Sequence, residues 1–104
     1  MDVLKEILEC LVRCGVEAEI RKDRIEPYVN VGDVKSVKNR MQFWYIEKNS
    51  EVHMYIGTEM GKWYNKSKKS VYLKPDYRYS FKENRVEFPN INLALQFIEE
   101  VSKM

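Results

Sequence analysis

The chain has few of the residues that break a fold or hold it together covalently. Its 104 residues include four glycines, three prolines, two cysteines and one histidine. So little glycine and proline excludes a low-complexity linker, and the sequence contains no internal repeat. Hydrophobic residues make up 44% and charged residues 33%, which is typical of a globular protein and not of a disordered one. The length predicts a single domain over residues 1–104.

Long apolar runs are also missing. No stretch approaches the roughly 20 apolar residues that a helix needs to span a bilayer. Asp2 and Glu6 lie inside what would be a signal peptide, and no unbroken apolar segment follows them. We therefore expect a cytoplasmic protein that has no membrane partner.

Cysteine and histidine are too scarce for a metal site. Cys10 and Cys14 lie four residues apart on a predicted helix, which puts their Cα atoms near the outer limit for a disulfide. A tetrahedral zinc site needs about four ligands, and His53 is the only histidine. We interpret both cysteines as buried structural thiols and expect neither a metal nor a cofactor.

Catalytic motifs are incomplete. Three residues separate Gly57 from Gly61, whereas a phosphate-binding loop needs four, and Trp63 follows the lysine where serine or threonine is required. His53 has no serine or cysteine near it in a recognisable arrangement, so we interpret it as a solvent-facing residue. We expect a protein that is not an enzyme.

One nuclease-like pattern is an alternative. Asp33 and Lys35 could form half of a metal-dependent site, with Asp23 or Glu26 as the upstream acid. In such sites the carboxylates hold a metal that activates water, and the lysine stabilises charge. The glycine before Asp33 favours a turn instead, so the nuclease is our second alternative.

Hydrophobic periodicity predicts a helix near each end of the chain. Residues 2–14 carry apolar side chains at helical spacing, with Asp2 as the N-cap and Gly15 just past the end. A closing helix follows Asn90, the second predicted cap, and extends to Val101.

Strands are predicted between the two helices. They cover residues 16–21, 25–31, 41–47, 52–56, 71–73, 77–81 and 85–88. In the second strand, Ile25 shares a face with Val29 and Val31, and Pro27 predicts a place at a sheet edge. In the fourth, Val52, Met54 and Ile56 point inward while His53 and Tyr55 point outward. Residues 57–70 fit a short helix and a basic loop equally well.

This order of elements predicts an α+β fold. We expect a single antiparallel sheet of about five to seven strands, with the N- and C-terminal helices packed on one face. The opposite face should be solvated and carry Tyr55 and Tyr72. We assign four phenylalanines to the core: Phe43, Phe81, Phe88 and Phe97.

Residues 35–82 combine basic charge with aromatic rings. They hold eleven lysines and arginines against four acids, a net charge of +7, and ten of the thirteen aromatic residues. Both flanks of this segment are acidic. Cations beside flat rings suit a polyanion with bases that can stack.

We therefore predict a small binding protein that contacts nucleic acid through this segment. The proposed contacts are Lys62, Trp63, Tyr64, Lys66, Lys68, Lys69, Tyr55 and Tyr72. The lysines would bind phosphates and the rings would stack on bases, which requires Trp63 and its neighbouring ammonium groups to stand in solvent.

The alternative is a protein–protein interaction module. It would be a small inhibitor or regulator of the phage or mobile-element type, using an edge strand and exposed aromatic residues. A homodimer could form through the same edge strand. The sequence leaves DNA, RNA and protein open as targets.

Overall fold

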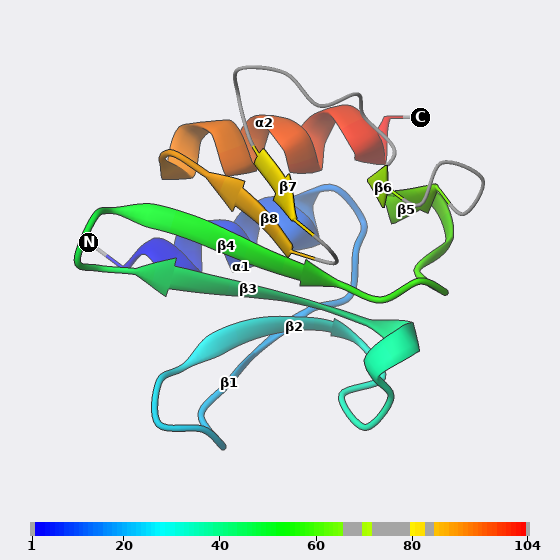
Figure 1. Ribbon diagram of the computed structural model, residues 1–104, viewed down its shortest axis with the longest axis horizontal. Helices are drawn as coiled ribbons and strands as arrows, with labels where there is room; N and C mark the ends of the chain where they lie inside the picture. The colour runs from blue at the N-terminus through cyan, green and yellow to red at the C-terminus, as the bar shows by residue number, and fades with distance from the viewer. Residues whose placement is uncertain (1, 66–69, 72–79, 83–84, 104) are drawn as a thin grey trace.

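A six-stranded antiparallel sheet with both terminal helices on one face forms most of the computed structural model (Figure 1). The structure describes residues 2–65, 70–71, 80–82 and 85–103. The helices are α1 (Val3–Arg13) and α2 (Ile91–Ser102). In sheet order, the strands are β1 (Glu19–Arg21), β2 (Tyr28–Gly32), β3 (Arg40–Ile46), β4 (Glu51–Ile56), β8 (Arg85–Phe88) and β7 (Ser80–Lys82). The predicted fold class is confirmed.

Shorter elements complete the described part of the chain. Two 3-10 turns are η1 (Val37–Asn39) and η2 (Gly61–Trp63). A separate two-stranded ladder joins β5 (Tyr64–Asn65) to β6 (Ser70–Val71). Neither of the helices found in the described ranges is long and apolar enough to cross a membrane.

The helix ends lie where the sequence predicts them. The carboxylate of Asp2 accepts a hydrogen bond from the backbone N–H of Leu4 at 3.1 Å, and Asn90 caps α2 through the N–H of Leu93 at 3.0 Å. Gly15 follows α1 with φ +81°, a left-handed conformation that glycine adopts without a steric penalty. The two N-caps, Asp2 and Asn90, each satisfy an N–H group that the helix itself leaves unpaired.

The core lies between the sheet and the two helices. One cross-strand row, Val29–Phe43–Met54–Val86, is fully buried in all four strands. From the helices, the buried side chains include Ile7 and Leu11 of α1 and Phe97 and Ile98 of α2. The core assignments of Phe43, Phe88 and Phe97 are confirmed, while the side chain of Phe81 lies outside what the structure describes.

The β3–β4 hairpin has the predicted facing. Val52, Met54 and Ile56 are buried, and His53 and Tyr55 point to the opposite face. The register pairs Trp44 with His53 and Gln42 with Tyr55, so the outward positions of β3 are Arg40, Gln42, Trp44 and Ile46. These four side chains form a line along the face that carries no helix.

The second strand differs from its prediction in extent and position. It begins at Tyr28, and Ile25 is fully exposed in the preceding bend. Pro27 favours an extended or turn conformation in the residue before it, and its own missing N–H costs nothing because it precedes the ladder. The prediction of an edge strand is also wrong, because β1 covers that side of β2.

The cysteines are free thiols packed between the helices. Cys10 is buried and Cys14 is half-buried. Burial, with a further contribution from Cys14, raises the pKa of Cys10 to about 11. Cys10 is therefore a protonated, unreactive thiol at neutral pH, as expected of a structural cysteine.

Candidate nucleic-acid interface

Trp63 lies in the interior, so the prediction that its ring stands in solvent is wrong. Turn η2 places it beside α2, where its ring centroid is 6.2 Å from that of Phe97, and the residue is 5% exposed. An indole buries a large apolar area when it packs, which outweighs the advantage of a solvated position. Trp63 therefore anchors its segment to the helix layer and cannot stack on a base.

Lys62 is engaged in the same structural contact. Its Nζ donates to the backbone carbonyl of Ser102 at 3.2 Å and lies 6.0 Å from the centroid of the Trp63 ring. A cation at the C-terminal end of α2 hydrogen-bonds a carbonyl that the helix leaves unpaired, and it interacts favourably with the negative end of the helix dipole. Tyr64 is half-buried beside these residues.

The remaining predicted contacts are divided. Lys66, Lys68, Lys69 and Tyr72 lie outside the described residues, so their role stays a prediction. Tyr55 is 39% exposed on the open face of the sheet, whereas Lys62 and Trp63 pack at the end of α2. The structure therefore does not bring Tyr55 together with Lys62 and Trp63.

A groove follows β3 on the open face of the sheet. Its volume is about 360 Å³, and it is lined by Arg24, Val37, Arg40, Gln42, Trp44, Ile46, Tyr55, Ile56 and Gly57. The four outward side chains of β3 form its floor. From Arg40 to Ile46, an extended strand covers about 20 Å.

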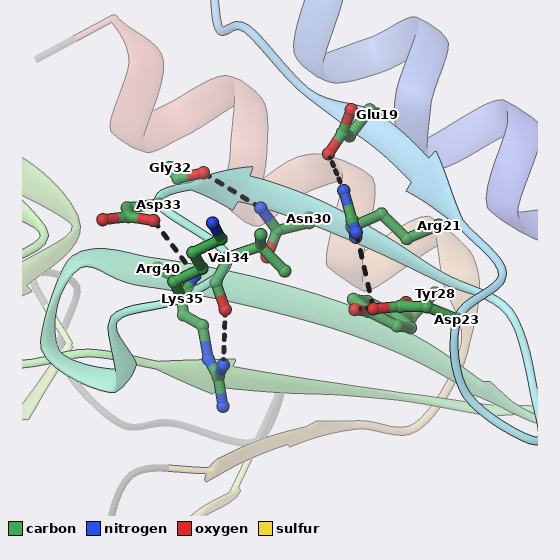
Figure 2. Close-up of polar contacts among 10 residues, drawn as sticks. All are labelled: Glu19, Arg21, Asp23, Tyr28, Asn30, Gly32, Asp33, Val34, Lys35 and Arg40. Carbon is green, nitrogen blue, oxygen red and sulfur yellow. Dashed lines mark hydrogen bonds and ion pairs between the residues drawn. The ribbon is translucent and has the colours of Figure 1, made fainter.

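Two arginines line the groove. Arg40 begins β3, and its Nη1 donates to the backbone carbonyl of Val34 at 2.8 Å (Figure 2). Arg24 belongs to the turn between β1 and β2, which the strand register places toward the other end of β3. Within the described ranges, neither arginine has an acidic partner, and no acidic side chain lines the groove.

Other cations on this face are neutralised locally. The ion pairs are Arg21 with Glu19 (2.8 Å) and Asp23 (3.4 Å), Arg85 with Glu87 (2.8 Å), and His53 with Glu51 (2.9 Å, if the imidazole is protonated). Figure 2 shows Arg21 held between its two carboxylates. Among the described side chains of β1, β2, β3, β4 and β8 on this face, the cations without an acidic partner therefore lie in the groove.

The rings of the groove are held in place before any ligand binds. Trp44 stacks on Tyr28 with centroids 4.5 Å apart and an interplanar angle of 18°. The Tyr28 hydroxyl donates to Asp23 at 2.8 Å, and this hydrogen bond is the main reason that the pKa of Asp23 is lowered. Tyr55 lies opposite Gln42 on the neighbouring strand and presents the more exposed ring.

One wall of the groove is fixed by a close backbone contact. A Cβ added to Gly57 would overlap the carbonyl oxygens of Val37 and Lys38, so only glycine lets η1 pack against the end of β4. Gly57 also donates its N–H to the carbonyl of Arg40 at 2.9 Å. Val37 is thereby held at the rim with 61% of its surface exposed.

Asp33 acts as a turn residue. Its carboxylate accepts a hydrogen bond from the backbone N–H of Lys35 at 3.0 Å (Figure 2). Asp23, one proposed upstream acid, is engaged with Tyr28 and Arg21. Nowhere in the part of the chain that the structure describes do three or more His, Cys, Asp or Glu side chains gather to hold a metal ion. The geometry gives the nuclease alternative no support.

The sequence reasoning missed the residues that line the groove from β3. Alternation around Phe43 could have found them, because a core assignment for Phe43 sends Gln42 and Trp44 to the other face. No comparable pattern in the sequence places Arg24 beside β3.

The chain matches no protein-family model, and no curated protein or solved structure is significantly similar to it.

Proposed function

We propose that this is a non-enzymatic binding protein that holds nucleic acid in the groove along β3. The observation that carries the proposal is a groove with two arginines, two aromatic rings and no described carboxylate. Guanidinium groups bind phosphate through pairs of parallel hydrogen bonds, and rings stack on bases of any sequence.

The energetics favour a polyanion over a neutral ligand. Arg24 and Arg40 could each neutralise a phosphate and release counterions. A base stacked on Tyr55 would add about 1–3 kcal/mol. Because Tyr28 and Trp44 are already packed together, little conformational entropy is lost when the groove is filled.

Reversal of Arg24 tests the proposal directly. Filter binding of a labelled oligonucleotide at 50–200 mM salt should give a steep salt dependence for the wild type. Arg24→Glu should weaken binding about tenfold and lower the salt slope by about 1. Arg24 is exposed and has no partner among the described residues, so the variant should fold normally.

Lys5→Glu is the matched control. It makes the same change of charge at an exposed position of α1, on the helix-covered side. Wild-type affinity in Arg24→Glu, or equal losses in the two variants, would contradict the groove as the binding site.

The lysines outside the described residues have a separate test. Lys66, Lys68 and Lys69 changed together to Glu should weaken nucleic-acid binding further if they extend the phosphate contacts. If the triple variant binds like the wild type, the groove alone carries the interaction.

A protein partner is the second candidate. Two exposed apolar residues lie near the groove: Ile25 follows Arg24 in the chain, and Val37 is at the groove rim. In addition, β1 is an edge strand only three residues long. Such a complex would depend weakly on salt and would be lost in Val37→Asp. Dimerisation through β1 stays a prediction.

A further inference from the structure

Gln42 is an unpartnered amide in the floor of the groove. It is 6% exposed, yet its carboxamide makes no hydrogen bond with any residue that the structure describes. The nitrogen and oxygen of Gln42 are not among the described side-chain atoms that are sealed from solvent without a partner, so they still reach the groove. Both its N–H and its oxygen are therefore available to a ligand.

The cross-strand neighbours of Gln42 also carry polar groups. Gln42 lies opposite Asn30 on one side and Tyr55 on the other. Asn30 is also buried, and its Oδ1 has no partner in the described part of the chain, while its Nδ2 donates to the carbonyl of Gly32 at 3.0 Å (Figure 2). The row therefore places the exposed ring of Tyr55 beside Gln42 in the groove, while Asn30 lies outside the groove lining.

We propose that the groove binds a single, unpaired strand and that Gln42 hydrogen-bonds the edge of one base. This inference rests on the proposed function and adds the strandedness and the residue that contacts a base. Tyr55 stacks on the base that Gln42 contacts, and the two arginines contact flanking phosphates.

The recessed position of Gln42 excludes a duplex. The bases of a duplex are stacked inside it, and their edges are reached by an element that protrudes into a groove, such as a helix or a β-ribbon. Here the amide lies in the floor, with Arg24 and Val37 among the lining residues. An unpaired base can turn out of its strand and enter.

The donor and acceptor pattern of an amide suits an unpaired base. A carboxamide offers an N–H donor and an oxygen acceptor side by side. In a single strand the Watson–Crick edge of each base is free and presents a donor beside an acceptor, so Gln42 can form two hydrogen bonds with it. In a duplex the same groups are already paired with the opposite base.

Homopolymer binding tests the inference. The probes are 12-nucleotide strands of adenine, cytosine and thymine, the adenine strand as RNA, and the adenine strand annealed to its complement. The wild type should bind each single strand about tenfold more tightly than the duplex. The RNA strand should bind like its DNA counterpart, because none of the proposed contacts involves the ribose.

Gln42→Met keeps the length of the side chain and removes the amide. It should lose the preference for single strands over the duplex while keeping the salt slope set by the arginines. Gln42→Glu, which keeps the polarity and loses the donor, should lose the preference as well. Gln96→Leu, at an exposed position of α2, is the matched control and should change neither.

The possible failures are distinct. A single-strand preference that survives in both Gln42 variants, or duplex affinity equal to that of the single strands in the wild type, overturns the inference and leaves the proposed function standing. Absence of binding to every probe at 50 mM salt overturns both.

Discussion

The two faces of the sheet differ in the kind of side chain that they bury. On the helix-covered face, the row through Phe43 is apolar and fully buried. One residue along, the row through Gln42 on the open face carries amides, an exposed tyrosine and a paired arginine. A slip of one residue in register would exchange the two rows, so the apolar row fixes the position of the polar one.

The open face also buries polar groups at a cost. Tyr28, Asn30 and Gln42 are buried there although no helix covers them. Within the described ranges, the Oδ1 of Asn30 and the Nε1 of Trp44 are buried and lack partners. Exceptions to polar satisfaction tend to occur at functional sites, since selection for stability alone would remove them.

The largest expected effect lies on the covered face. Phe43→Ala should lower the free energy of unfolding by about 3–5 kcal/mol, because it leaves a cavity in the closed core. Urea unfolding followed by circular dichroism measures this loss. Gln42→Met, at the adjacent position, should change stability by less than about 1 kcal/mol. Similar losses at both positions would break the contrast between the faces.

Gly57→Ala should have the next largest effect. The added methyl group forces η1 away from the end of β4, at a cost of about 1–3 kcal/mol. The groove wall moves with η1, so oligonucleotide affinity should fall as well. Gly61→Ala is a useful comparison, because the space around its added Cβ is open, although φ +58° there also strains alanine. Unchanged oligonucleotide affinity in Gly57→Ala would show that the wall does not shape the binding site.

Tyr28→Phe should have a smaller effect that depends on pH. The hydrogen bond from Tyr28 lowers the pKa of Asp23 in the folded protein, so it contributes stability above the ordinary carboxyl pKa near 4. That contribution is lost as the pH falls through the lowered pKa of Asp23. Urea midpoints of wild type and variant should therefore differ at pH 7 and converge below about pH 4. A pH-independent difference would contradict this role.

Trp44→Phe should have the smallest effect on stability, within about 1 kcal/mol. The smaller ring can still stack on Tyr28, and the substitution removes a buried N–H that has no described partner. A loss as large as that of Phe43→Ala would show that the open face carries as much of the fold as the covered one.

Most of the fold could be predicted from periodicity and caps. Asp2, Gly15 and Asn90 mark the helix ends through local hydrogen bonds and backbone conformation, which a sequence reveals directly. Alternation in β4 gave the correct facing of His53 and Tyr55. These features depend on neighbours within a few residues.

The errors involve contacts between distant parts of the chain. Trp63 is buried because α2, more than thirty residues later, offers Phe97 as a partner. The groove joins Arg24 to β3 through the strand register, which no local pattern reveals. The lysine-rich segment was visible in the sequence, whereas the lack of an acidic ion-pair partner for Arg24 and Arg40 among the described residues required the fold.

The two tryptophans report on different surroundings. Trp63 is enclosed against Phe97, and Trp44 lies in the groove against Tyr28. Intrinsic emission should therefore contain one component that a soluble quencher barely reaches and one that a stacked nucleobase would dim. In Trp44→Phe only the sheltered component of Trp63 is left. The fluorescence of Trp44 in the unlabelled protein therefore reports whether the groove is occupied.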